Sequence, residues 1–222
     1  MEEHIVKIIN AEMVTHNVKR FTIEKPSNYK FTPGQATEIS INKPKLKDER
    51  RPFTFTSLAK WPALEFTIKI YNDHNGVTNA LGNLSPGDEI ILHDVWGAIR
   101  YKGSGVFIAG GAGVTPFIAI LRDLFDRGEI EGNRLIFSNR TAADIILKKE
   151  FEMMLGDNFF NTLTREQNTE FNFGRIDKEF LEKQVINFHK NFYVCGPDKF
   201  VKDILQNLEN LGARPESLVF EE

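Results

Sequence analysis

The chain has 222 residues, of which 41% are hydrophobic and 27% are charged, and its formal net charge is -3. This length allows one large domain or two modest ones, each with its own core, and we expect two. The small net charge gives no overall attraction to nucleic acid or to an anionic membrane, so neither is expected as a partner. No apolar run approaches the roughly 20 residues of a membrane-spanning helix, and the N-terminus lacks the basic and apolar regions of a signal peptide. We therefore expect a cytoplasmic protein without membrane insertion.

The single cysteine, Cys195, limits the possible cofactors. It cannot form an internal disulfide, and a plant-type iron–sulfur cluster needs four cysteine ligands. The five histidines are scattered without the close spacing of common zinc motifs. The sequence therefore predicts neither a metal site nor a fused ferredoxin module.

In the first half of the chain, from residue 5 to about 100, apolar and polar residues alternate within short segments that are separated by turn residues. Alternation of apolar and polar residues is typical of antiparallel strands, and it predicts strands over residues 5–9, 18–23, 36–41, 53–57, 64–71 and 89–93. One helix is expected to begin between Gly76 and Thr78 and to continue through Leu81. This pattern predicts an antiparallel β-barrel over residues 1–100.

The stretch over residues 51–57, Arg-Pro-Phe-Thr-Phe-Thr-Ser, stands out within this half. A strand with a two-residue period places Arg51, Phe53, Phe55 and Ser57 on one face. A cation, aromatic rings and hydroxyls on one strand suit a flavin nucleotide. The alternative is a strand rich in Thr and Phe that is entered through an Arg-Pro turn.

The pattern of apolar and polar residues changes after residue 105. An apolar run over residues 106–109 is followed by a glycine loop over residues 110–116, Gly-Gly-Ala-Gly-Val-Thr-Pro, and by a helical pattern through residue 125. Strand–helix alternation recurs over residues 134–155 and 191–211, which predicts an α/β domain with a parallel sheet over residues 101–222. The glycine loop has the position of a nucleotide-binding loop between a strand and a helix. It lacks the Gly-Lys-Ser/Thr end of a P-loop, so ATP chemistry is disfavoured.

Taken together, the motifs over residues 31–35, 51–57, 76–81, 110–116 and 193–197 resemble those of the ferredoxin-NADP reductase superfamily, in family order and along nearly the whole chain. The resemblance implies an FAD-binding barrel domain followed by an NAD(P)-binding domain. It also implies that Arg51 binds the pyrophosphate of FAD, that Phe53 packs on the flavin or ribityl, and that the Thr54 hydroxyl lies near flavin N5. Many family members have Tyr where this chain has Phe53.

The same resemblance makes Gly76, Val77 and Thr78 a second phosphate site, at the N-terminus of a helix where backbone N–H groups face an anion. Any turn that leads into a helix with a Thr would look similar. Lys69, on the strand ahead, is a candidate for the adenine half of FAD. The alternative for Lys69 is a solvated lysine on an exposed strand.

For the nicotinamide dinucleotide, the resemblance assigns the glycine loop and the motif around the cysteine. Thr115 would lie near the nicotinamide, and Cys195 would orient it. The expected loop and turn residues are Gly111, Gly113, Pro116, Gly196 and Pro197. Alternatively, the cysteine is a core residue, as a lone buried thiol usually is.

Three arginines, Arg140, Arg165 and Arg175, follow predicted strands and favour NADPH, because arginine suits the additional phosphate of that cofactor. NADH stays possible, since some NADH-using members of the family carry similar sequence segments at these positions. In the family a Glu near the C-terminus approaches the flavin, and Glu221 is the candidate here. An acidic tail is more often a solvated chain end.

The sequence thus predicts an FAD-dependent oxidoreductase that takes hydride from NADPH onto flavin N5 and passes electrons to a separate ferredoxin or flavodoxin. The basic loop over residues 43–51 is the candidate docking site for such an acidic partner, or is a solvated hairpin tip. Two other functions stay open. One is a reductase of free flavin or ferric chelates, and the other is a non-catalytic flavin-binding subunit.

Overall fold

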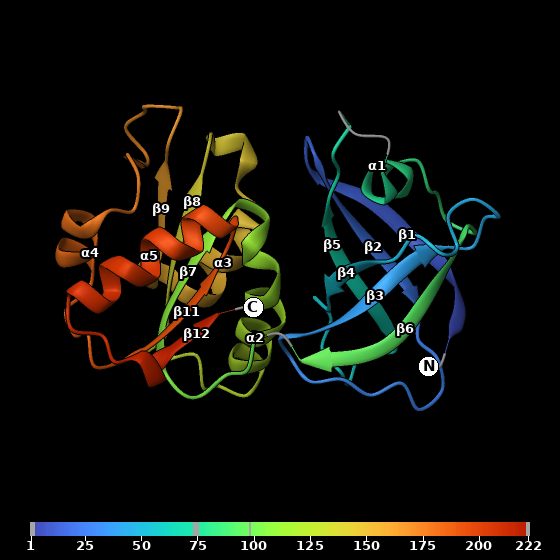
Figure 1. The fold of residues 1–222 in the computed structure, drawn as a ribbon, viewed down its shortest axis with the longest axis horizontal. Helices are drawn as coiled ribbons and strands as arrows, with labels where there is room; N and C mark the ends of the chain where they lie inside the picture. The colour runs from blue at the N-terminus through green and yellow to red at the C-terminus, as the bar shows by residue number, and fades with distance from the viewer. Residues whose placement is uncertain (1–2, 73–75, 98, 221–222) are drawn as a thin grey trace.

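The computed structural model describes residues 3–72, 76–97 and 99–220. Its strands form two separate six-stranded sheets, one in each half of the chain (Figure 1). The first is antiparallel and the second is parallel, so the predicted two-domain fold, a barrel followed by an α/β domain, is confirmed. Within the described ranges, no helix is both long and apolar enough to cross a membrane.

The N-terminal sheet has the strand order β4-β3-β6-β1-β2-β5. Its strands are β1 (His4–Thr15), β2 (Val18–Glu24), β3 (Gln35–Ile41), β4 (Arg51–Thr54), β5 (Ala63–Lys69) and β6 (Glu89–Gly97). Side chains alternate across it: Val6 and Ile8 are buried, whereas Ile5, Lys7 and Ile9 of the same strand are exposed. The helix of this half, α1 (Val77–Gly82), packs Val77 and Leu81 into the core of the barrel.

The sheet closes on itself just after β4. The N–H of Phe55 donates to the carbonyl oxygen of Gln35 in β3 at 3.1 Å, and the next N–H, of Thr56, donates to Glu65 in β5 at 2.8 Å. The chain therefore changes partner from β3 to β5 at this corner. For this reason the strand expected over residues 53–57 ends at Thr54, and the following Phe55 turns fully into the barrel core.

The C-terminal sheet has the order β10-β9-β8-β7-β11-β12, and all its pairings are parallel. Its strands are β7 (Gly105–Gly110), β8 (Arg134–Asn139), β9 (Phe159–Leu163), β10 (Asn172–Phe173), β11 (Asn191–Cys195) and β12 (Leu218–Phe220). Because the strands are parallel, their carboxyl ends share one edge, where ligands bind in open α/β sheets. The short strands β10 and β12 were not anticipated from the sequence.

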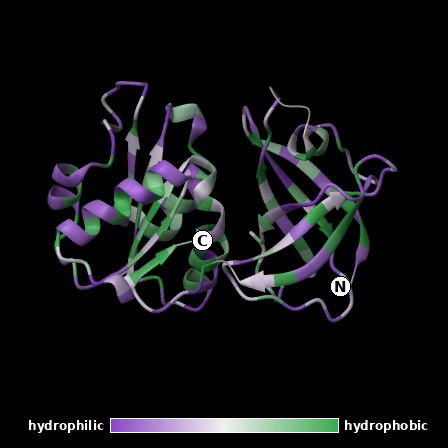
Figure 2. Cartoon of the chain, in the orientation of Figure 1, coloured by the Kyte–Doolittle hydropathy of each residue, from purple (hydrophilic) through white to green (hydrophobic). Residues whose placement is uncertain are grey.

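Helices cover both faces of this sheet: α2 (Thr115–Asp126) and α3 (Lys148–Leu155) cover one face, and α4 (Lys178–Gln184) and α5 (Asp198–Asn210) cover the other. The strands alternate accordingly, since Phe107 and Phe137 pack toward α2 and α3, and Ile108 and Ile136 toward α4 and α5. In Figure 2 the strands of this sheet are mostly white to green, whereas the helices α4 and α5 are mostly purple, the colour of hydrophilic residues.

The helix α2 lies between the parallel sheet and the barrel (Figure 1). The apolar cluster around it includes Val18 from the start of β2 and Ile99 from the connection between the two sheets. The two domains therefore share packed side chains along α2, which sits on the barrel-facing side of the parallel sheet.

Candidate functional site

The loop between β7 and α2 forms one wall of the candidate site. It is a single turn of 3-10 helix over Gly111–Val114. Gly111 has a φ of +54°, a left-handed conformation that glycine adopts at no steric cost. A Cβ at Gly113 would lie 2.4 Å from the carbonyl oxygen of Cys195, so only glycine fits between this loop and the end of β11. Both glycines are thus required by backbone geometry.

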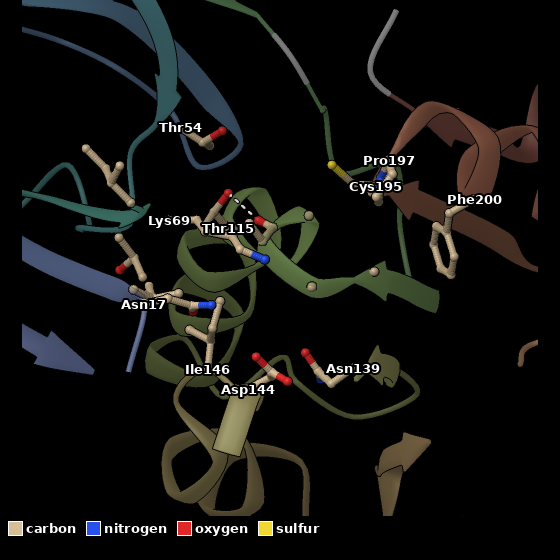
Figure 3. A pocket seen from close by; sticks show the side chains of 18 of the residues that line it. Asn17, Thr54, Lys69, Thr115, Asn139, Asp144, Ile146, Cys195, Pro197 and Phe200 are labelled. Carbon is tan, nitrogen blue, oxygen red and sulfur yellow. Dashed lines mark hydrogen bonds between the residues drawn. The ribbon is translucent and has the colours of Figure 1, made fainter. Parts of the chain in front are cut away.

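The helix α2 begins directly after this loop. Its first residue is Thr115, whose hydroxyl donates to the carbonyl oxygen of Ala112 at 3.0 Å (Figure 3). The second residue, Pro116, is buried and has no N–H to satisfy at a position where the helix supplies no acceptor. The positive end of the helix dipole, at Thr115, therefore lies at the wall of the cavity.

The end of β11 forms the adjoining wall. Cys195 is 7% exposed and lines the cavity, and in Figure 3 its sulfur points toward the side on which Thr54 lies. A Cβ at Gly196 would lie 2.6 Å from the ring of Phe200, so this glycine lets the ring pack closely. Pro197 follows as the residue that precedes α5.

The carboxyl ends of β8 and β9 supply polar side chains. Ser138, Asn139 and Thr164 all line the cavity. Asn139 is 4% exposed, and both polar atoms of its carboxamide are buried without a partner among the described residues. A buried polar group without a partner costs free energy, so this amide is suited to a ligand that enters the cavity.

The three predicted arginines lie near this edge at different distances from the cavity. Arg140 is exposed and lines the cavity. Arg165 lies beside it, because its backbone N–H donates to the carbonyl oxygen of Arg140 at 2.9 Å. Arg165 and Arg175 are exposed, but neither is part of the cavity wall.

The barrel forms the opposite wall. Phe53 and Thr54 at the end of β4, Lys69 at the end of β5, and Thr78 in the first turn of α1 all line the cavity. The side of the barrel that carries these residues faces the carboxyl edge of the parallel sheet. Together, the walls from both domains enclose a cavity of about 580 Å³, which is within the range of small-molecule sites.

Several lining residues were not predicted from the sequence: Asn17, Val18, Ala36, Thr67, Ile68, Tyr71, Asp144, Ile146 and Phe200. Strand pairing explains part of this set. Ala36 pairs with Thr54, and Val18 pairs with Lys69. A correct barrel register would have identified both, but no local motif marks them.

Some predicted residues lie outside the cavity wall. The Arg51 guanidinium donates to the carbonyl oxygen of Arg50 at 2.6 Å and lies 3.6 Å from the carboxylate of Glu49. Gly76 precedes α1, which has no side-chain cap, and the Val77 side chain is buried in the barrel core. At the start of α1, the backbone N–H groups of Gly76 and Val77, rather than their side chains, are the groups suited to an anion such as a phosphate.

Glu221 lies outside the described residues. The last described residue, Phe220, is 36% exposed and pairs with Val194, one residue before Cys195. The last described strand therefore ends beside the wall that carries the cysteine.

The cavity walls fit a flavin and a nicotinamide dinucleotide. The pyrophosphate groups require cations and backbone donors, and Lys69, Arg140 and the glycine loop offer both. The unpartnered amide of Asn139 offers donors and an acceptor for polar groups of a nucleotide. Phe53 offers an aromatic surface for a planar ring. Within the described part of the chain, no cluster of His, Cys, Asp or Glu could hold a metal ion.

Two protein families match successive parts of the chain. Residues 4–87 match a family described as an FAD-binding domain, and residues 107–206 match one described as an oxidoreductase NAD-binding domain. The first match falls on the barrel and the second on the parallel sheet, so each half of the cavity wall comes from one of these domains.

Similar proteins match over most of the chain. The NADH-cytochrome b5 reductase 2 of Coccidioides immitis is 30% identical, over 90% of this chain and 67% of the relative. The NADH–cytochrome b5 reductase 1 of Arabidopsis thaliana is 26% identical, over 95% and 80%. A crystal structure of a ferredoxin NADP+ reductase from Neisseria gonorrhoeae with bound FAD and NADP has the same fold, with a TM-score of 0.84, 22% identity, and coverage of 96% of this chain and 92% of the other.

Proposed function

The chain belongs to the ferredoxin-NADP reductase superfamily and is an NAD(P)H-dependent flavoprotein reductase that uses FAD, and from this membership we propose that it oxidises NADPH and delivers electrons to a separate ferredoxin or flavodoxin. We further propose that residues 1–100 bind FAD and residues 101–222 bind the nicotinamide dinucleotide. The observation that supports the proposal is the single cavity whose walls carry Phe53 and Thr54 on one side and Thr115 and Cys195 on the other.

In this proposal each wall has its own task. FAD, when bound, would supply a group that takes hydride from the nicotinamide and releases electrons to the acceptor. Phe53 would pack against the flavin, and the Thr54 hydroxyl would lie near its reacting edge. Thr115 and Cys195 position the nicotinamide, which must approach to roughly 3 to 3.5 Å for direct transfer. Cys195 would orient the ring by contact, since hydride transfer needs positioning rather than a covalent adduct.

The preference for NADPH rests on the groups at the ends of β8 and β9. An acidic residue near the ribose 2′-hydroxyl favours NAD, whereas an arginine accommodates the 2′-phosphate of NADP. Here Ser138, Arg140 and Thr164 line the cavity, and Arg165 is adjacent. Among the described lining residues, the carboxylate at this edge is that of Asp144. One of its oxygens accepts hydrogen bonds from the backbone N–H and hydroxyl of Thr141 at 2.9 and 2.7 Å, and the other lies 3.6 Å from Nε2 of His16. These groups favour a phosphate over a ribose diol.

A separate protein acceptor fits the loop between β3 and β4. Within this loop Lys43 pairs with Asp88 at 3.6 Å, whereas Lys45 and Lys47 are exposed and pair with no acidic residue among those described. Exposed lysines attract acidic partners and raise the rate of encounter. Strand β4 leads from this loop to Thr54, so a partner docked there would contact the same strand that carries a lining residue of the cavity.

The test is the visible spectrum of the FAD-loaded protein under anaerobic conditions, after mixing with NADPH or NADH. We expect faster loss of flavin absorbance with NADPH, and we expect Arg140→Gln to slow the reaction with NADPH about 10-fold at subsaturating concentration, the effect of a lost charged hydrogen bond. NADH is the matched control and should respond little to this change.

Recovery of absorbance on adding oxidised ferredoxin or flavodoxin would support the acceptor. Faster bleaching with NADH would contradict the coenzyme assignment, and the absence of recovery would contradict the acceptor.

A further inference from the structure

A buried arginine on α2 joins the two domains. Arg122 is 8% exposed, and its guanidinium donates hydrogen bonds in two directions. Within its own domain, Nε and Nη2 donate to the two carboxylate oxygens of Glu150 in α3, at 2.5 and 2.9 Å. Across the interface, Nη1 donates to a carboxylate oxygen of Glu65 and to the carbonyl oxygen of Thr56, both at 2.6 Å. One side chain thus connects two helices of one domain to the barrel of the other.

The barrel partners of Arg122 form the corner at which the barrel closes. The hydroxyl of Thr56 donates to the same carboxylate of Glu65 at 2.8 Å, and the N–H of Glu65 donates to Ser57 at 3.0 Å. The ring of Trp61 lies 5.2 Å from the guanidinium carbon of Arg122. The arginine therefore contacts a rigid, internally bonded part of the barrel rather than a loose loop.

The charges at this junction keep the arginine ionised. Burial acts to lower the pKa of Arg122, but hydrogen bonds and charge from Glu150 and Glu65 outweigh burial and raise the pKa above its usual value. Glu65 is itself only 8% exposed, so both members of this interdomain pair are buried. Removing one member of such a group leaves a buried charge uncompensated, which is far more costly than losing an exposed pair.

The junction is rigidly connected to both walls of the cavity. Thr115 lies seven residues before Arg122 on the same helix, about 10 Å along its axis. Thr54 lies two residues before Thr56, about 7 Å along an extended chain. A shift at the junction would therefore move the two walls relative to each other.

We propose that Arg122 is a positioning residue that sets the separation of the two cavity walls, and with it the approach of the nicotinamide to the flavin, through its bonds to Glu65 and Thr56. This inference rests on the proposed transfer of hydride across the cavity. Arg122 does not line the cavity, so it acts only through α2 and the barrel corner. A misplacement of about 1 Å can lower the rate of a reaction about 100-fold.

Another ion pair across the same interface supplies a matched comparison. Lys60 of the barrel pairs with Asp126, the last residue of α2, but these side chains are 61% and 40% exposed. An exposed pair is solvated in either domain arrangement and contributes little. Both pairs join the barrel to α2, but only the buried pair is expected to fix the separation of the two cavity walls.

The experiment compares Glu65→Gln, which weakens the interdomain bonds, with Glu150→Gln, which weakens only the intradomain bonds, and with Lys60→Gln. Rapid mixing of the FAD-loaded proteins with NADPH gives the dissociation constant of the nucleotide and the limiting rate constant of flavin reduction. We expect Glu65→Gln to lower the rate constant by about 10- to 100-fold and to leave the dissociation constant within about 3-fold of that of the unmodified protein. The other two variants should keep both constants within about 3-fold.

A second measurement reports the junction without any reaction. In a Trp96→Phe background, Trp61 is the one remaining tryptophan, and its emission is recorded for the full chain with and without FAD. Glu65→Gln should shift this emission to longer wavelength as water reaches the ring. Should Glu65→Gln fail to fold, Arg122→Lys replaces it, because lysine keeps the charge but cannot bond both sides.

The outcomes separate this inference from the proposed function. An unchanged rate constant in Glu65→Gln would overturn the positioning role while reduction of the unmodified protein continued. A lowered rate constant with unchanged Trp61 emission would also overturn it, since the walls would then not have moved. If no nicotinamide nucleotide reduced the unmodified protein, the proposed function would fail. Unchanged Trp61 emission in Glu65→Gln would then still overturn the positioning role of Arg122.

Discussion

The two walls of the cavity are built in different ways. In the parallel-sheet domain the part of the wall formed by the glycine loop depends on backbone geometry: Gly111 adopts a left-handed φ, and Gly113 lies where any Cβ would meet Cys195. In the barrel the wall depends on side chains at strand ends, such as Phe53, Thr54 and Lys69. The glycine loop therefore tolerates almost no change of residue, whereas the barrel wall can exchange one side chain for another of similar shape.

This difference has a physical origin. A parallel sheet presents the ends of its strands at one edge, and a ligand there meets backbone N–H groups and a helix N-terminus. A barrel presents strand sides, so a ligand meets whichever side chains the register places outward. Changes in the glycine loop should therefore have all-or-none effects, and changes of lining side chains should have graded effects.

The largest expected effect is at Gly113. In Gly113→Ala the added methyl group would lie 2.4 Å from the carbonyl oxygen of Cys195, so the loop or the end of β11 must shift. We expect the rate constant of flavin reduction by NADPH to fall about 100-fold or more, with a stability loss of about 1–3 kcal/mol. Affinity for FAD, measured by fluorescence titration, should be unchanged because the barrel is untouched.

The control is Gly97→Ala in β6, where an added Cβ meets nothing within 4 Å and the backbone is not left-handed. This variant should reduce its flavin at the rate of the unmodified protein. If Gly113→Ala did the same, the wall would not depend on backbone approach, and the comparison between the two walls would lose its basis.

The same difference explains which parts of the site could be predicted from the sequence. The glycine loop and the Cys-Gly-Pro turn are local motifs, because their geometry requires particular residues at consecutive positions. All but Pro116 of their predicted residues line the cavity. Strand and helix periodicity likewise predicted the antiparallel sheet, the parallel sheet that follows it in the chain, and the helix α2.

The barrel wall was harder to predict. Ala36 and Val18 line the cavity because of their cross-strand partners, and register is a long-range property. The direction of the Arg51 side chain depends on Glu49 and on the carbonyl of Arg50, which compete for the guanidinium. The junction at Arg122 was missed as well, because within α2 this arginine resembles any polar residue of an amphipathic helix.

A second prediction concerns a side chain of the parallel-sheet domain that lies away from the cavity. The Tyr193 hydroxyl donates to the carbonyl oxygen of Gly103 at 2.6 Å and accepts from the N–H of Lys102 at 2.8 Å. Burial raises its pKa to about 12. Below pH 10 the hydroxyl is protonated in the folded and unfolded states alike, whereas between pH 10 and 12 only the unfolded state loses the proton.

The stability of the unmodified protein should therefore fall as the pH rises through this window, by on the order of 2 kcal/mol in total. Tyr193→Phe should remove this part of the pH dependence and cost about 1–3 kcal/mol at pH 7, because Lys102 and Gly103 lose their partner. Urea unfolding at pH 7 and pH 11 measures both effects. Flavin reduction at pH 7 should be unchanged, since Tyr193 does not line the cavity. A loss of activity in the folded variant would contradict the separation of this hydroxyl from the site.

The smallest expected effect is on the barrel wall, at Thr54. Thr54→Val keeps the shape and branching of the side chain and removes only the hydroxyl, which lines the cavity on a residue that is 9% exposed. The loss of one neutral hydrogen bond to the flavin predicts a decrease of about 3- to 10-fold in the rate constant of flavin reduction, and Thr54→Ser should restore most of it. Because strand β4 pairs with β3 through its backbone, the barrel should keep its fold in both variants. A 100-fold loss in Thr54→Val, equal to that of Gly113→Ala, would mean that the two walls respond alike and that the hydroxyl is as essential to the reaction as the glycine backbone.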